Sequence, residues 1–177
     1  MAKAQLTSED WIKAGFRALT RAGPQAIRVE PIARDLSVSK GSFYWHFKDL
    51  AALKAAMLSS WETHATGEVI AAIQHMKGSA HDRLDALIAQ SSQMRTDVGG
   101  AGAEPAIIDW ARYDPLAADA VQKVTKQRIA YLTTLFAEAG PDAERHAQLF
   151  YATYLGMHHI PTDRAAILTV LRDKLLP

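Results

Sequence analysis

Apolar residues recur at helical spacing along most of this chain, and that periodicity limits its fold more than any other feature of the sequence. No stretch shows the sustained alternation of apolar and polar residues, bounded by hairpin turns, that is typical of strands. The chain has 177 residues and no cysteine, and at this length it can bury a hydrophobic core without disulfide support. We therefore expect an all-α fold.

Capping residues, glycines and prolines divide the chain into about nine expected helices. The first begins at a capping box, Thr7 with Asp10, and ends at Gly23. Asp49 caps the fourth, which we expect to run without a break to about Met76. The other helices are expected at about residues 30–36, 40–46, 80–97, 105–112, 115–139, 141–158 and 161–175.

The second and third helices are short, and a tight turn separates them. Three helices in this order predict a helix-turn-helix, whose last helix enters the major groove of DNA. Phe43 and Phe47 are four residues apart and would hold that helix against the core, which leaves its other face free. That face and its flanks carry donors and cations suited to phosphate oxygens and base edges, namely Arg28, Ser39, Lys40, Ser42, Tyr44, Trp45, His46 and Lys48.

Positive charge is concentrated in the same part of the chain. The formal net charge is +1, but residues 1–54 hold nine lysines and arginines against five acids, and the remainder holds eleven against fourteen. An excess of positive charge in the first part alone favours a polyanionic partner for that part.

The sequence also indicates the cellular compartment of the protein. Its first residues are polar and charged, unlike a signal peptide, and no apolar run approaches the roughly 20 residues of a membrane-spanning helix. We therefore expect a cytoplasmic protein with no membrane partner.

The run from Arg28 to Leu53 closely resembles the DNA-binding signature of the TetR family of transcriptional regulators; it reads RVEPIARDLSVSKGSFYWHFKDLAAL. The first helix, WIKAGFRALTRAG, falls in the same register. The segment from Asp109 to Pro115, followed by a long helix, is more loosely similar to part of the family's ligand domain. The resemblance implies a homodimer that binds operator DNA through a helix-turn-helix domain, residues 1–48, and a ligand-binding and dimerisation domain, residues 49–177.

The resemblance further implies roles for single residues. Tyr44 and Lys48 would contact backbone phosphates, and His46 would contact a phosphate or pack beside one. Lys40, Ser42 and Trp45 would face the major groove.

Two positions depart from the family's pattern. Ser37 stands where many members have glycine in the turn, and a left-handed backbone there would cost about 1 kcal/mol. Gly15 stands where alanine is usual in the first helix, at a cost of about 1 kcal/mol in helix propensity.

Large apolar residues are frequent in the C-terminal domain, where ligand sites of helical bundles lie between helices. Candidates for an apolar wall with two polar anchors are Trp61, His64, Gln93, Met94, Trp110 and Tyr113. Each of the last two helices is apolar on two faces, whereas a monomeric surface helix needs only one. Candidates for a dimer interface are Phe150, Tyr154, Ile167 and Leu171.

Two functions follow from these patterns. The first is a repressor that a small apolar or aromatic effector releases from a palindromic operator. The second is a DNA-binding regulator without such an effector, controlled by a protein partner or by its abundance. Residues 37–40 match the S-x-x-K pattern of penicillin-binding enzymes, but no K-T-G follows, and no spacing of metal ligands is present. We expect no enzymatic activity, metal or cofactor.

Overall fold

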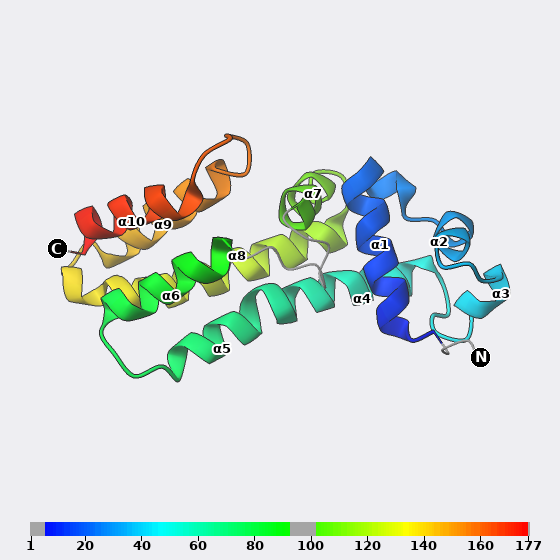
Figure 1. Ribbon diagram of the computed structural model, residues 1–177, viewed down its shortest axis with the longest axis horizontal. Coiled ribbons are helices and arrows are strands. Elements are labelled where there is room, and N and C mark those ends of the chain that lie inside the picture. Colours follow the sequence, from blue (N-terminus) through cyan, green and yellow to red (C-terminus); the bar gives the residue numbers. More distant parts are fainter. Residues whose placement is uncertain (1–5, 93–101, 177) are drawn as a thin grey trace. The chain divides into compact units, whose positions relative to one another are not determined.

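The computed structural model describes residues 6–92 and 102–176, which form helices and turns without any strand (Figure 1). The predicted all-α fold is thus confirmed. The helices are α1 (Ser8–Ala22), α2 (Val29–Asp35), α3 (Lys40–Phe43), α4 (Leu50–Glu62), α5 (Glu68–Gln74), α6 (Ala80–Ser92), α7 (Ala103–Trp110), α8 (Pro115–Phe136), α9 (Ala143–Gly156) and α10 (Arg164–Leu175). None of them is long and apolar enough to cross a membrane.

The described residues divide into two compact units. The first unit comprises residues 6–63 and 102–121, and the second comprises residues 64–92 and 122–176. This division follows packing within the chain. The predicted functional boundary between residues 48 and 49 stays a prediction.

Helix α1 begins and ends as the sequence predicts. The Thr7 hydroxyl accepts a hydrogen bond from the Asp10 amide at 3.3 Å, and the Asp10 carboxylate accepts one from the Thr7 amide at 2.8 Å. The hydrogen bonds that the Asp10 carboxylate accepts from the Thr7 amide and from the Thr7 hydroxyl hold the pKa of Asp10 below its usual value. Gly23 ends the helix with φ of +77°, a conformation that glycine adopts at little cost.

The core of the first unit lies where α1 packs against α2, α4 and α7. Trp11, Phe16 and Leu19 supply its apolar face from α1. Opposite them, α4 contributes Leu53 and Met57, which are fully buried. Helices α2, α4 and α7 are therefore all anchored to α1 by one apolar core.

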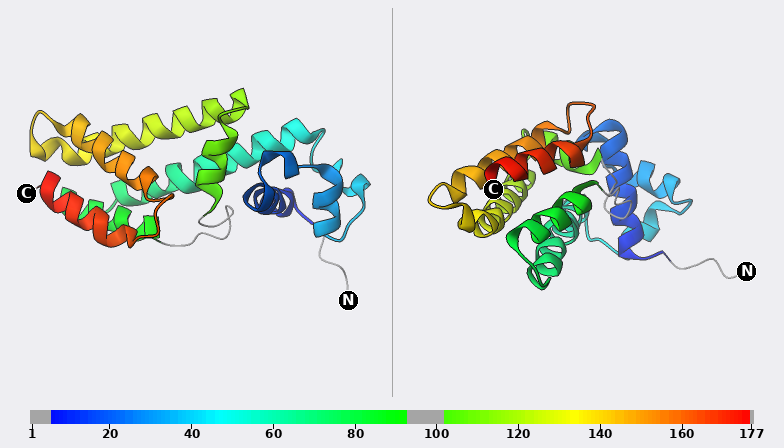
Figure 2. Two further views of the ribbon diagram at one scale, coloured as in Figure 1. Left: turned by 90° about the horizontal axis from the view of Figure 1, so that it is seen from above. Right: turned by 60° about the vertical axis from the view of Figure 1, so that its left-hand side comes forward.

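In the second unit, α6 packs against α5 and α10, and α9 packs against α10 (Figure 2). The C-terminal half of α8 adds Leu135 and Phe136 to the same core. Phe136 meets Phe150 of α9 with ring centroids 5.8 Å apart.

The long fourth helix predicted from Asp49 to Met76 is interrupted. Asp49 caps it as predicted, accepting from the Ala52 amide at 2.7 Å, but Thr63–Gly67 winds as a π-helix between α4 and α5. A π turn changes the backbone hydrogen-bond register over a few residues and leaves the apolar pattern readable as helix, so periodicity does not reveal it.

The third helix is also shorter than predicted, ending at Phe43 instead of His46. Beyond it the His46 amide donates to the Phe43 carbonyl at 2.9 Å, three residues back, so the last turn is tighter than an α-helix. The predicted helix over residues 80–97 is described only as far as Ser92.

Candidate nucleic-acid interface

Aromatic packing fixes α3 and the turn after it. Phe43 is fully buried, and its ring lies edge-on to Trp11 at 5.3 Å and stacks on Phe47 at 5.7 Å. Phe43 and Phe47 thus form the buried side of α3 and the turn after it, as their spacing of four residues predicts.

The turn before α3 has the predicted left-handed residue. Ser37 has φ of +56°, and it alone among the described non-glycine residues has a positive φ. The next residue, Val38, donates its amide to the Ala33 carbonyl at 2.9 Å, which closes the turn. A serine here costs about 1 kcal/mol relative to glycine, and the surrounding hydrogen bonds hold it in place.

Two large aromatic side chains are exposed at the end of α3. Tyr44 is 56% exposed and Trp45 is 88% exposed, whereas side chains of this size usually bury most of their surface. Ser39, at the start of the helix, forms no capping hydrogen bond with its hydroxyl. This face therefore combines exposed apolar surface with hydroxyl donors.

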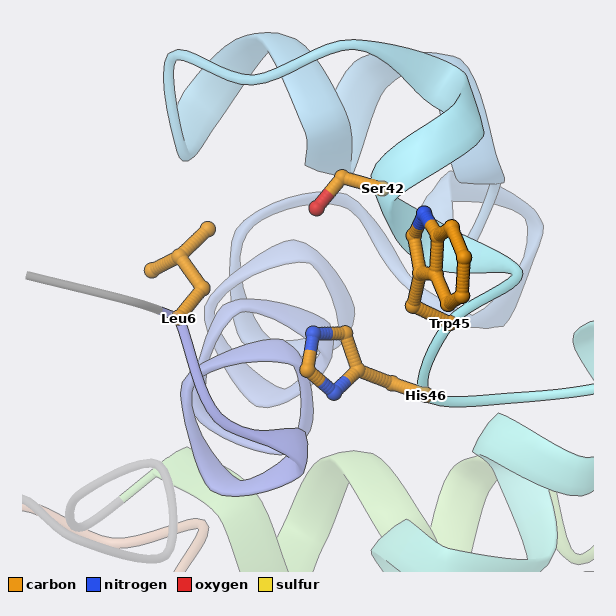
Figure 3. A pocket seen from close by; sticks show the side chains of 4 residues that line it. All are labelled: Leu6, Ser42, Trp45 and His46. Atoms are coloured by element: carbon orange, nitrogen blue, oxygen red, sulfur yellow. The ribbon is translucent and has the colours of Figure 1, made fainter.

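A hollow of about 450 Å³ lies beside these aromatics, lined by Leu6, Ser42, Trp45 and His46 (Figure 3). The figure shows Leu6, from the segment before α1, facing Ser42 and His46 across it. Leu6 is not among the residues predicted from the sequence to contact DNA. Its place directly before the helix cap is that of a hydrophobic staple, a signal that could have indicated it.

Exposed cations lie near these aromatic residues in the sequence. Arg28, Lys40 and Lys48 are exposed, and Lys40 carries an ion pair: its Nζ lies 2.5 Å from Oε1 of Glu30. The hydrogen bond from Lys40 lowers the pKa of Glu30 and raises the pKa of Lys40. Glu30 is not among the residues predicted from the sequence to lie at this site.

Chemically, this surface offers what a duplex needs. Cations and hydroxyl donors match phosphate oxygens, and an indole edge matches thymine methyl groups. All eight residues predicted to contact DNA lie in one continuous segment from Arg28 to Lys48. Their individual contacts with DNA stay predictions.

Residues 12–57 match the family of bacterial regulatory proteins named tetR. The helix-turn-helix segment of this chain thus carries the TetR-family signature. The match runs from Ile12 in α1 to Met57 in α4, includes all of α2 and α3, and indicates a DNA-binding transcriptional regulator. No curated protein matches the sequence.

Solved structures share the TetR fold over nearly the whole chain. A Rhodococcus protein assigned to the TetR family is 22% identical, with a TM-score of 0.75 over 96% of this chain and 98% of its own. Reduced NemR of E. coli is 20% identical, with a TM-score of 0.69 over 96% and 94%. A regulator from Saccharomonospora viridis, solved in complex with choline, is 15% identical, with a TM-score of 0.76 over 94% and 93%.

The predicted ligand residues have different surroundings. Trp61 and Trp110 are buried in the core of the first unit, each 2% exposed, whereas Tyr113 is 77% exposed. In the second unit His64 pairs with Glu68, Nδ1 to Oε1 at 2.9 Å. Gln93 and Met94 lie outside the residues that the structure describes. A ligand role for any of these residues stays a prediction.

The environment of Trp110 is polar on one side. Its indole Nε1 donates to Oδ2 of Asp114 at 2.9 Å, and Nζ of Lys54 lies 5.4 Å from the centre of its ring. Lys54 and Asp114 are themselves 3.8 Å apart. These contacts join α4 to the end of α7, so a ligand reaching Trp110 would have to disturb them.

The predicted dimer residues also differ in exposure. Phe150 is 5% exposed and belongs to the core, and Tyr154 stacks on Tyr151 at 6.2 Å. Leu171 is partly buried in the same core. Ile167 and Val170 of α10 are 38% and 61% exposed, and Leu149 of α9 is 49% exposed. The exposed apolar surface therefore lies mainly on neighbouring positions of the same two helices.

Proposed function

We propose that this protein is a transcriptional repressor that binds a partly palindromic operator as a homodimer and is released by a small apolar or aromatic effector. Exposed Tyr44 and Trp45 carry the DNA-binding part of the proposal. A folded domain gains nothing from exposing rings of this size, but they suit a groove that presents thymine methyls and phosphates. Since its partner is DNA, we also place the protein in the cytoplasm.

The DNA-binding part is tested by selecting duplexes from a random library with the full-length protein and measuring affinity for the selected site. A two-fold dimer should select half-sites about one helical turn or slightly more apart. If each subunit neutralises about three or four phosphates, log K should fall with log salt with a slope of about −5 to −7.

The decisive variant replaces Lys40, Tyr44 and Lys48 together by alanine. Loss of base and phosphate contacts worth about 1 to 3 kcal/mol each should weaken operator binding by at least about 100-fold. A control with Lys123→Ala and Lys126→Ala, which removes two exposed cations of α8, should bind as the wild type does. Unchanged affinity in the triple variant would remove the assignment of this face to DNA.

The choline complex of the Saccharomonospora viridis regulator supports the effector part, because it shows that this fold accommodates a small molecule. Apolar and aromatic compounds should therefore be screened for release of the selected operator. A typical coupling of about 2 to 3 kcal/mol would reduce operator affinity roughly 30- to 150-fold. A compound that binds the protein yet leaves operator affinity unchanged would contradict induction and leave the DNA-binding assignment standing.

A further inference from the structure

The ion pair between Glu30 and Lys40 lies on the face proposed to contact DNA. Glu30 is in the first turn of α2, and Lys40 is the first residue of α3. Their side chains are 57% and 53% exposed, and the ammonium and carboxylate lie 2.5 Å apart. Each group stabilises the charge of the other, so both are ionised at neutral pH and the pair has no net charge.

A neutral pair responds weakly to a phosphate. The phosphate attracts the ammonium of Lys40, but it repels the carboxylate of Glu30 a few ångströms away. An isolated lysine, by contrast, gains from every phosphate it approaches and releases a counterion there. Lys40 therefore contributes little to DNA binding that depends on charge alone, and Glu30 weakens such binding.

A base pair presents a different pattern to the same two groups. In the major groove a G·C pair places the acceptors N7 and O6 of guanine beside the amino donor of cytosine. The ammonium of Lys40 has three donors, of which one can stay on Glu30, and the carboxylate accepts hydrogen bonds. An A·T pair instead presents an acceptor, a donor and an acceptor. If the two side chains keep the same positions, the O4 oxygen of thymine lies against the carboxylate of Glu30.

We propose that Glu30 and Lys40 act as one recognition unit for a G·C base pair, which makes Glu30 a specificity-determining residue outside the recognition helix. Lys40 donates to guanine, and Glu30 accepts from cytosine and opposes contacts that involve phosphates alone. This proposal rests on the proposed DNA-binding function.

The test compares full-length wild type, Glu30→Ala, Glu30→Gln and Asp142→Ala on the selected operator and on a scrambled duplex. Asp142→Ala removes the same charge from the second unit, where Asp142 pairs with Arg145 at 2.9 Å. It therefore controls for the change in net charge. Glu30 is exposed, and thermal unfolding of each variant checks that the fold is intact.

Glu30→Ala should bind the scrambled duplex several-fold more tightly and lower the ratio of operator to scrambled affinity about tenfold, the effect of one mismatched base pair. Duplexes selected with this variant should lose the preference for G·C at one position of each half-site. Glu30→Gln keeps an acceptor and should raise scrambled-duplex affinity while retaining part of that preference. In a Lys40→Ala background, Glu30→Ala should change base preference much less than it does in the wild type.

The results separate this inference from the function on which it rests. If the wild type selects no duplex sequence, the proposed function fails and this inference fails with it. If the wild type selects an operator but Glu30→Ala behaves like Asp142→Ala, or relaxes only A·T positions, the recognition unit alone is wrong.

Discussion

Among single residues, Gly15 has a role that helix propensity does not describe. A Cβ added at this position would lie 2.5 Å from Sδ of Met57, closer than atoms in proteins approach. Met57 is fully buried, so its side chain would have to repack within the core to make room for the added atom. The interpretation of Gly15 as only a propensity cost is therefore incomplete, because the glycine allows α1 to pack closely on α4.

We predict that Gly15→Ala destabilises the protein although it favours the helix. The gain in propensity is about 1 kcal/mol, whereas overpacking a core costs about 1 to 3 kcal/mol. Denaturant unfolding should show a net loss of up to about 2 kcal/mol. In a Met57→Ala background, where the clash is absent, the same substitution should be stabilising. Equal effects in both backgrounds would show that Met57 does not set the cost.

At the scale of elements, the π-helical segment Thr63–Gly67 depends on a residue far away in sequence. Arg128 of α8 donates from Nε to Oγ1 of Thr66 and from Nη2 to the carbonyl oxygen of Ala65, both at 3.0 Å. Its guanidinium also lies 5.9 Å from the rings of both Tyr151 and Tyr154. Thr66 is 1% exposed, so water would not replace these bonds without disruption.

We predict that Arg128→Met loosens this segment locally. Hydrogen bonds to charged groups contribute about 1.5 to 3 kcal/mol each, so stability should fall by about 2 kcal/mol or more. Amide exchange should accelerate over residues 63–67. Arg128→Lys should not restore protection, because an ammonium lacks the forked geometry of guanidinium. Lys126→Met, an exposed neighbour on α8, provides the control. Unaltered exchange in Arg128→Met would show that the π turn is held by other contacts.

At the scale of the whole molecule, the exposed apolar surface of α9 and α10 bears on the proposed homodimer. Val170 is 61% exposed, so replacing it leaves the core intact, whereas Phe150 is 5% exposed and its replacement would test folding as well. Val170 is therefore the more discriminating position at which to test association.

We predict that Val170→Glu sediments as a monomer and binds the operator much more weakly, because a buried unpaired carboxylate in an interface is strongly unfavourable. Gln127→Glu, which adds the same charge at an exposed position of α8, should remain dimeric. Sedimentation velocity at micromolar concentration measures both. A wild-type protein that is monomeric at this concentration would contradict the proposed dimer.

The helix caps, the aromatic pair and the strained turn could be predicted from local chemistry in the sequence. Thr7 with Asp10, Phe43 with Phe47, and Ser37 all act over a few residues, where backbone geometry is nearly the same in any fold. The helical periodicity was likewise enough to predict an all-α fold, because each helix needs one apolar face.

Which helices meet depends on contacts between residues that are distant in sequence. Glu30 and Lys40 are ten residues apart, and Arg128 reaches Thr66 across 62 residues of sequence. Such contacts depend on how helices pack, which periodicity does not specify. The π turn and the close approach at Gly15 could not be predicted for the same reason. Each involves a residue distant in sequence, and a local sequence pattern does not indicate such a partner.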